Sequence, residues 1–152
     1  LDNSIDIDFS QGSIVNSKFF MSKNDAIDFS GSIVNLDKIY IFGSGDKGIS
    51  VGEGSVLNGK DILIENSNIG IASKDDSSVY LENIIINNVN IGLAAYIKKI
   101  EYGSPKIEVS NIKLSNYKHD YISDLNSQII IDHKQIANIN CKENIEVCDF
   151  IN

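Results

Sequence analysis

The sequence predicts an all-β solenoid, in which the chain winds in coils and lays the short strands of each coil over those of the coil before. The first observation is a repeat: SNIGIAS (residues 67–73) recurs as VNIGLAA (residues 89–95), an offset of 22 residues. The second is that short runs such as IDIDF and SVYLEN alternate apolar and polar residues, which is the period of a β-strand. The third is composition: Ile, Asn, Ser and Asp are abundant, a mixture that favours strands and turns over helices.

Columns of similar residues appear when the sequence is stacked in steps of 22 residues, and such a period indicates a solenoid, propeller or array. This length is too short for a four-stranded propeller blade but suits a coil with three short strands. One column is always large and apolar and is predicted to face the core: Ile5, Ile27, Ile49, Ile71 and Leu93. Two more apolar columns are expected: Phe20, Phe42, Ile64 and Ile86, and, two positions earlier, Tyr40, Ile62 and Ile84.

Small and polar columns predict the turns between strands. Residues at one position are always small, as expected where the backbone turns tightly into a strand: Ser4, Ala26, Gly48, Gly70 and Gly92. Two further columns are predicted to form ladders of side-chain hydrogen bonds: Asn24, Asp46, Asn68 and Asn90, and Ser22, Ser44, Asn66 and Asn88. A drifting Gly-Ser or Ser-Ser signal predicts a corner of variable length, at residues 12–13, 31–32, 54–55, 77–78 and 103–104.

The 152 residues are predicted to form a single domain, because this length supports one core. Clear repeats are expected over residues 2–118, an irregular last turn over residues 119–140 and a C-terminal cap over residues 141–152. The interval after Leu93 is longer than the others, so either a loop protrudes there or the register slips. Cys141 and Cys148 fall in the cap, where they either form a small disulfide or remain two thiols.

The charge of the chain bounds its partners. The sequence has 13 basic and 21 acidic residues and a net charge of −8, which argues against nucleic acid or an anionic membrane surface as the main partner. No run of about 18 apolar residues occurs, so no membrane insertion is predicted. The chain begins at Leu1 rather than at a methionine, so we expect a fragment or a processed product.

Four segments carry a resemblance to a known family: NDAIDFSGS, GDKGISVGEGS, NIGIASKDDSSVYLEN and NIGLAAYIKKIEYG. They resemble the repeats of the pectate-lyase-like superfamily and, more narrowly, β-helix regions of bacterial and archaeal exported or surface proteins, some joined to spore-coat-kinase-like domains. The resemblance implies a right-handed parallel β-helix and an extracellular or cell-surface location. It leaves the activity open, because the superfamily includes lyases, hydrolases, epimerases, phage spikes and noncatalytic adhesins.

One outward strip carries the candidate catalytic and metal-binding residues, since alternate residues of a strand face solvent. It begins with Asp6, Asp8 and Asp28 and ends with Lys74 and Tyr96. Stacked carboxylates about 5 Å apart repel each other and a hard cation would relieve that repulsion, so the three aspartates are candidate calcium ligands. In a lyase or epimerase, calcium would neutralise a uronate carboxylate and Lys74 would abstract the C5 proton.

Four residues nearby are candidate substrate contacts: Tyr96, Asp75, Asp76 and Lys98. The face of Tyr96 suits stacking on a sugar ring. Asp75 and Asp76 also resemble the paired aspartates of polygalacturonase-like hydrolases, but neighbours on a strand point to opposite faces, and the GHG and RIK signatures are absent. The plainer interpretation is that the aspartates satisfy turn backbone and that the lysines are surface charges.

The preferred function is that of a noncatalytic extracellular scaffold or binding module, which presents an acidic lateral face to a polysaccharide or a surface protein. The alternative is a calcium-dependent polysaccharide lyase or epimerase acting on uronate-containing glycans. The chain contains no arginine, which lyases of the superfamily usually place in the active site, and this favours the noncatalytic function. An open first strand layer near Asp2 would also be prone to edge-to-edge pairing with another copy.

Overall fold

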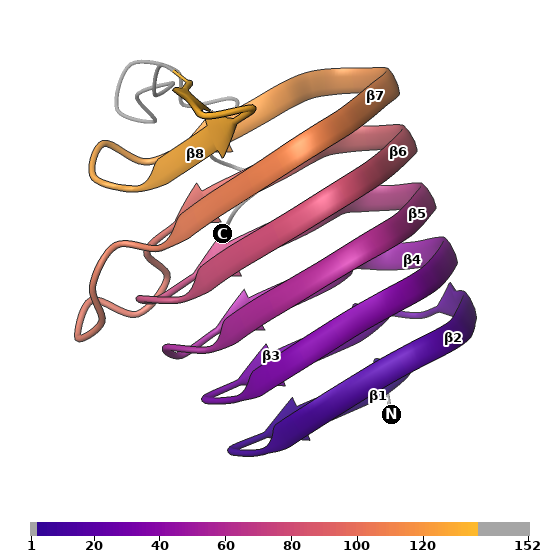
Figure 1. The fold of residues 1–152 in the computed structure, drawn as a ribbon, viewed down its shortest axis with the longest axis horizontal. Helices are drawn as coiled ribbons and strands as arrows, with labels where there is room; N and C mark the ends of the chain where they lie inside the picture. Colours follow the sequence, from indigo (N-terminus) through magenta and orange to yellow (C-terminus); the bar gives the residue numbers. More distant parts are fainter. Residues whose placement is uncertain (1–2, 137–152) are drawn as a thin grey trace.

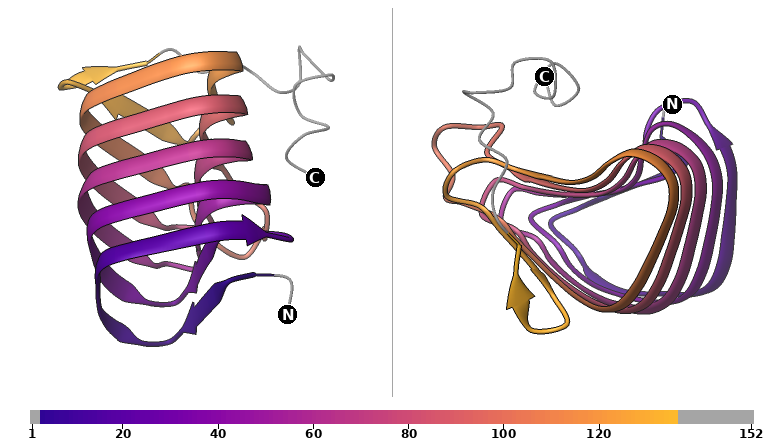
Figure 2. Two further views of the ribbon diagram at one scale, coloured as in Figure 1. Left: turned by 90° about the vertical axis from the view of Figure 1, so that its right-hand side faces the viewer. Right: turned by 90° about the horizontal axis from the view of Figure 1, so that it is seen from above.

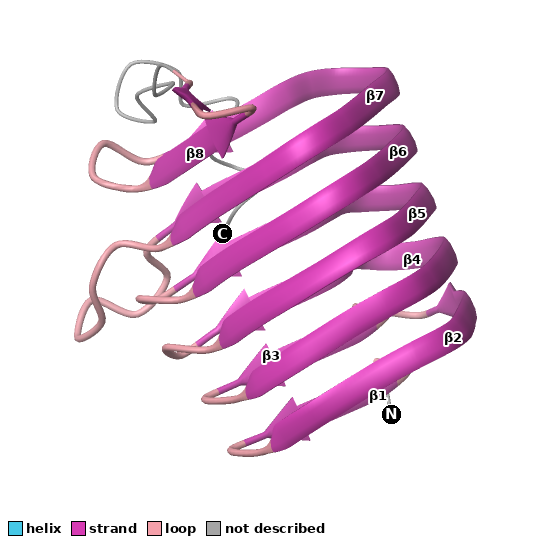
Figure 3. Ribbon diagram, in the orientation of Figure 1, coloured by secondary structure: helices cyan, strands magenta, loops and turns pink. Residues whose placement is uncertain are grey.

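The computed structural model describes residues 3–136 and shows a solenoid of about six coils (Figures 1 and 2). Strands make up the regular structure and no helix occurs in this range (Figure 3), so the described part contains no helix able to cross a membrane. The strands are β1 (Ile5–Asp8), β2 (Gln11–Ser22), β3 (Ile27–Ser30), β4 (Ile33–Gly52), β5 (Val56–Lys74), β6 (Ser78–Tyr96), β7 (Lys106–Ser123), β8 (Gln128–Ile131) and β9 (Lys134–Gln135).

Successive coils pair in parallel, which confirms the predicted solenoid. The order of strands in the sheet is β1-β3-β4-β5-β6-β7-β8-β9, with β2 beside β4, and only the last pair is antiparallel. The predicted core column is confirmed in full, because Ile5 aligns with Ile27, Ile27 with Ile49, Ile49 with Ile71 and Ile71 with Leu93.

Each coil has three sides, and the long strands continue around the corners between them. We name the outer surfaces by the segments that form them. The first face comprises residues 33–37, 56–60, 78–82 and 106–110; the second face comprises residues 39–42, 62–65, 84–87 and 112–115; the third face comprises residues 5–8, 27–30, 49–52, 71–74 and 93–96.

Two columns of left-handed residues turn the chain at the two ends of the second face. Their φ angles lie between 51° and 77°, a region that Asn, Asp and Gly reach at lower cost than other residues. The columns are Asn16, Lys38, Asp61, Asn83 and Asn111, and Met21, Gly43, Asn66, Asn88 and Asn116. The side chains also bond from coil to coil: Asn83 Nδ2 donates to Asp61 Oδ1 at 3.0 Å and Asn111 Nδ2 to Asn83 Oδ1 at 2.7 Å.

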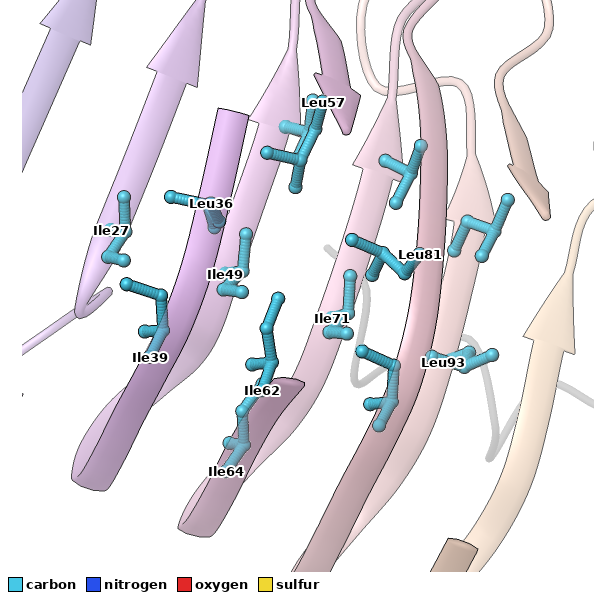
Figure 4. Packing of buried hydrophobic residues seen from close by; sticks show 14 of the residues in the cluster. Ile27, Leu36, Ile39, Ile49, Leu57, Ile62, Ile64, Ile71, Leu81 and Leu93 are labelled. Carbon is cyan, nitrogen blue, oxygen red and sulfur yellow. The ribbon is translucent and has the colours of Figure 1, made fainter. Parts of the chain in front are cut away.

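The core is filled by aliphatic side chains stacked in register (Figure 4). Ile27, Ile49, Ile71 and Leu93 are completely buried. Burying one such side chain stabilises the fold by about 1.5–3 kcal/mol before conformational entropy is subtracted. Repetition of this burial in every coil accounts for a fold that has little local structure of its own.

Two predicted apolar columns are wrong by one residue. Phe20 aligns with Phe42, but Phe42 aligns with Glu65, whereas the buried Ile41 aligns with Ile64. Likewise Tyr40 aligns with Leu63 on the outside of the solenoid, and Ile39 takes the predicted place of Tyr40 beside Ile62. The physical reason is that the corner at residues 53–55 has one residue more than the corner of the coil before. The aligned residues of β4 and β5 are therefore 23 positions apart from Ile33 to Ser44, and the register shift between Ser44 and Lys47 restores an offset of 22.

The turn ladders are partly as predicted. Asn90 Nδ2 donates to Asn68 Oδ1 at 2.8 Å, as expected, but Ser44 aligns with Ser67 rather than with Asn66. The drifting corner signal is confirmed at residues 31–32 and 54–55, where the N–H of Ser32 donates to Ser55 Oγ at 2.9 Å. It is wrong at residues 12–13, which lie within β2.

The longer interval after Leu93 corresponds to a protruding loop. Leu93 aligns with Tyr121, and the additional residues lie between the end of β6 and the start of β7. β7 runs on to Ser123, β8 follows, and β8 and β9 form a hairpin within the irregular last turn. The predicted cap over residues 141–152, with Cys141 and Cys148, lies outside the described residues.

Candidate functional site

The third face brings part of the predicted site together. Asp6 aligns with Asp28, and Lys74 aligns with Tyr96 in the next coil. The side chain of Lys74 reaches back over two coils, so that its Nζ lies 3.9 Å from Asp28 Oδ1. Asp8 aligns instead with Ser30 and is exposed.

The Lys74 ammonium group lies in a partly dehydrated position. Only 12% of its side-chain surface is exposed, and burial lowers the pKa of Lys74 below its ordinary value although Asp28 and Asp25 act in the opposite direction. The Lys74 side chain passes over Gly52, where an added Cβ would lie 3.4 Å from Lys74 Cε, in ordinary van der Waals contact. Lowering the pKa of a lysine raises the fraction of neutral amine, which is the form that can accept a proton.

Two charged residues that lie just before third-face segments were not predicted from the sequence. Asp25 and Lys47 are 4% and 8% exposed, and Asp25 Oδ1 accepts a hydrogen bond from the Lys47 N–H at 3.0 Å. Lys47 Nζ lies 3.7 Å from the same oxygen and also contacts Asp46. Burial raises the pKa of Asp25, against the opposing effect of Lys47. The sequence signal for this pair was Lys47 itself. It comes directly before the small residue of its coil, at a position that is apolar in the next two coils, where it aligns with Ile69 and Ile91.

Apart from Lys74, the later coils of the third face carry mainly apolar residues. A second buried cluster, separate from the core, consists of Ile69, Ala72, Ile91, Ala94, Tyr96 and Ile122. Tyr96 is 5% exposed, and burial is the main reason that its pKa is raised. In this arrangement the Tyr96 ring packs within the cluster, which leaves it little surface for a sugar.

The Asp75 carboxylate holds the protruding loop. Asp75 is 2% exposed, and its Oδ1 accepts hydrogen bonds from the backbone N–H groups of Lys98 and Lys99, each at 2.7 Å. Asp76 and the Lys98 side chain are exposed. Of the four candidate substrate contacts, Asp75 thus has a clear structural task, and Asp76 and Lys98 are accessible.

Residues 3–136 contain no complete set of metal ligands, because no group of three or more Asp, Glu, His or Cys side chains in this range could hold an ion. Asp28 Oδ1 is buried without a hydrogen-bond partner, and the cation nearest to it is the Lys74 ammonium group. The calcium site at Asp6, Asp8 and Asp28 therefore stays a prediction.

A groove of about 500 Å³ lies on the first face, where the sequence analysis placed no site. Two outward columns line it, one with Asn35, Asn58, Tyr80 and Glu108, the other with Asp37, Lys60, Glu82 and Ser110. With coils about 4.8 Å apart, the four aligned residues of each column extend the groove along the solenoid axis. His133, in the turn between β8 and β9, lines its far end.

An aromatic ring that lines this groove lies beside an ion pair at its border. Tyr80 is 39% exposed, and Lys106 Nζ lies 5.4 Å from the centre of its ring. Lys106 Nζ also lies 2.8 Å from Glu108 Oε2, and this hydrogen bond raises the pKa of Lys106 and lowers the pKa of Glu108. Asp37 Oδ1 is buried without a partner. The groove thus offers a ring face together with donors and acceptors.

Comparison of the chain with models of protein families, with curated proteins and with solved structures found no match. The structure itself shows a β-solenoid of stacked coils about 22 residues apart, consistent with a parallel β-helix repeat.

Proposed function

We propose that this chain is a noncatalytic carbohydrate-binding module that holds a glycan in the first-face groove. The observation that carries the proposal is the groove itself, in which Tyr80 stands among aligned amide, carboxylate and ammonium groups. Sugars present apolar C–H faces and a rim of hydroxyl groups, so an aromatic face beside hydrogen-bonding side chains complements them. The rigid coils keep these groups at fixed spacing, which lowers the entropic cost of binding.

The charges of the groove favour a neutral glycan over a uronate polymer. Three carboxylates line or border it, those of Asp37, Glu82 and Glu108, against the ammonium groups of Lys60 and Lys106. The whole chain carries a net charge of −8, which repels a polyanion at long range. Sugar hydroxyls both donate and accept hydrogen bonds, so they can pair with either sign of charge.

The setting that we propose is the cell surface or the extracellular space, as part of a protein of the pectate-lyase-like superfamily. Support comes from the β-solenoid architecture and from the repeat segments on which the resemblance rests. In that setting the solenoid also spaces neighbouring segments of a longer protein, since each coil adds about 4.8 Å to a stiff rod.

Binding measurements with a panel of neutral and uronate glycans test the proposal. Tyr80→Ala removes the ring, and we expect affinity for the bound neutral glycan to fall about tenfold or more, the equivalent of about 1.4 kcal/mol. Tyr117→Ala is the matched control, because Tyr117 is similarly exposed, at 45%, but lies outside the groove. Failure of every glycan to bind, or equal loss in both variants, would contradict the proposal.

The second candidate is a lyase or epimerase acting on uronate glycans at the third face. One observation favours it: the lowered pKa of Lys74, whose ammonium group lies near the Asp28 carboxylate. In this reaction Lys74 would accept the C5 proton, and calcium at Asp6, Asp8 and Asp28 would neutralise the uronate. Ultraviolet absorbance of an unsaturated product from pectate or alginate with calcium, lost in Lys74→Met, would support it. A melting temperature unchanged by millimolar calcium would argue against the metal.

A further inference from the structure

The first-face groove is longer along the solenoid axis than across it. Its floor consists of the strand positions between the two outward columns, namely Leu36, Gly59, Leu81 and Val109. The walls lie two residues apart on each strand, or about 7 Å, whereas the four coils span roughly 14 Å from first to last. A chain-like ligand therefore has more contact with the groove when it lies lengthwise.

Every coil of the groove places two hydrogen-bonding side chains opposite each other, one on each wall. The pairs, in chain order, are Asn35 with Asp37, Asn58 with Lys60, Tyr80 with Glu82, and Glu108 with Ser110. Because the coils are stacked in register, each pair lies about 4.8 Å further along the groove than the pair before. The groove therefore offers a row of four polar positions at even spacing.

The row of polar pairs ends at the β8–β9 hairpin. In the next coil Ile130 aligns with Glu108, so one wall position becomes apolar. The chain then reverses at Asp132 and His133, which both have left-handed φ angles, and β9 pairs antiparallel with β8. The wall of the groove is thus interrupted beyond the fourth pair.

The even spacing corresponds to the repeat of an extended sugar polymer. A β-1,4 linkage joins equatorial bonds on both rings of a glucose- or mannose-type sugar, so the chain continues as a straight ribbon. Each ring advances this ribbon by about 5 Å, close to the distance between two coils. An α-1,4 linkage contains an axial bond and curves the chain, so successive rings leave a straight groove.

Building on the carbohydrate-binding function proposed above, we propose that the groove binds a neutral β-1,4-linked glycan lengthwise, with one sugar ring beside the polar pair of each coil. The hydroxyl groups on the two edges of the ribbon then meet the two walls. Each wall offers both donors and acceptors, as Asn58 does on one wall and Lys60 and Glu82 do on the other. Tyr80 adds its ring at the third of the four positions.

This arrangement makes affinity depend on the length of the glycan. Each ring up to the fourth meets a new pair of side chains, whereas a fifth ring meets no further pair. The side chains are held on stacked coils, so an added ring makes its contacts without ordering a new segment of the protein. Affinity should therefore rise from a disaccharide to a tetrasaccharide and then level off.

Isothermal titration calorimetry with β-1,4-linked gluco- and manno-oligosaccharides of two to six rings tests the proposal. We expect affinity to increase by about tenfold or more from the disaccharide to the tetrasaccharide, and by less than about twofold from there to the hexasaccharide. The α-1,4-linked gluco-oligosaccharides are matched ligands, because they carry the same hydroxyl groups on a curved chain. At four rings they should bind about tenfold more weakly or worse.

A variant at one end of the row tests the direction of the glycan. Asn35→Ala removes one wall residue of the first pair, two coils away from Tyr80. We expect affinity for the tetrasaccharide to fall by about threefold to tenfold, whereas the disaccharide, bound beside Tyr80, should be unaffected. Asn35 is exposed, so the melting temperature should stay the same. Asn126→Ala is the control, because Asn126 is exposed in the loop between β7 and β8, outside the groove.

The outcomes separate the two proposals. Binding of no glycan would overturn the carbohydrate-binding function, and lengthwise binding with it. Three results would overturn lengthwise β-1,4 binding and leave the carbohydrate-binding function intact: affinity that levels off at two rings, equal affinity for α-linked chains, or an Asn35→Ala variant that does not selectively lose affinity for the tetrasaccharide.

Discussion

Lys74 and Asp28 lie two coils apart, yet the Lys74 ammonium group comes within 3.9 Å of an Asp28 carboxylate oxygen. The Lys74 side chain passes over Gly52, which lies in the intervening coil. At 3.9 Å the two atoms attract each other electrostatically without a hydrogen bond. A largely buried lysine and an oxygen without a hydrogen-bond partner therefore face each other across the intervening coil.

The pH dependence of stability should reveal the Lys74 environment. Because burial lowers the pKa of Lys74 in the folded state, the unfolded chain binds more protons between that pKa and 10.5. The contribution of Lys74 to stability therefore rises with pH across this window. Urea unfolding of the wild type and Lys74→Met at a series of pH values should show a stability difference that moves in favour of the wild type up to about pH 10.5.

Subtracting the stability curve of Lys74→Met from that of the wild type removes the contributions of other groups that titrate at alkaline pH. Burial raises the pKa of Tyr96, so its contribution acts in the opposite direction and is lost as pH rises above 10.0 in both proteins. Asp28→Asn supplies a second check: it removes the nearest carboxylate, so the pKa of Lys74 should fall further and the window should widen. A pH-independent difference between the wild type and Lys74→Met would show that the amine is solvated like an ordinary surface lysine.

Substitution of Gly70 tests how closely the coils approach at the small-residue column. A Cβ on Gly70 would lie 2.6 Å from the backbone oxygen of Gly92, and backbone cannot move aside cheaply. We expect Gly70→Ala to cost about 3 kcal/mol, measured by urea unfolding. Gly12→Ala is the control, because nothing lies within 4 Å of its added Cβ, and it should change stability by less than about 0.5 kcal/mol. Similar losses in both variants would contradict the steric explanation.

The corner residue Asn83 makes two separable contributions to the stability of the fold, one through its backbone conformation and one through its side-chain hydrogen bonds. Its φ of 59° favours Asn or Gly, and its side chain bonds to Asp61 and Asn111 in the coils on either side. Asn83→Gly keeps the backbone conformation and loses the hydrogen bonds, at about 1 kcal/mol. Asn83→Ala loses both, at about 2 kcal/mol. Equal unfolding midpoints for the two variants would mean that left-handed strain is unimportant at this corner.

The period of the sequence was enough to predict the fold because a solenoid repeats its environment. Ile27, Ile49 and Ile71 have equivalent neighbours in successive coils. A residue type that recurs every 22 residues therefore indicates the same position in each coil. The same reasoning failed where the step changed. One extra residue near Gly54 shifts the following coil by one position from Val56 to Ser67, so Phe42 aligns with Glu65 rather than Ile64. The offset returns to 22 residues at Lys47 and Ile69, so a fixed period of 22 residues does not detect the insertion.

The sequence predicted part of the corner pattern: Asn66 and Asn88 were expected to form a turn ladder, and Asn88 Nδ2 donates to Asn66 Oδ1 at 2.6 Å, but the second column of left-handed residues was not predicted. Left-handed residues lie five positions apart on both sides of each second-face segment, as at Asn83 and Asn88 and again at Asn111 and Asn116. The first-face groove had no comparable signal. The residue type in each column of the groove changes between coils, from amide to aromatic to carboxylate. Only the structure, in which Asn58 aligns with Tyr80, shows that these residues form one surface.

The protruding loop should loosen when the Asp75 carboxylate is removed. Asp75→Ala deprives the backbone N–H groups of Lys98 and Lys99 of their shared acceptor, and we expect trypsin to cleave after these lysines at least several times faster. Asp76→Ala is a closely matched control, because both aspartates have left-handed φ angles, 53° and 62°, so alanine introduces the same backbone strain. Equally fast cleavage of both variants would assign the effect to strain in the corner, whereas faster cleavage of Asp75→Ala alone would identify the carboxylate as the anchor of the loop.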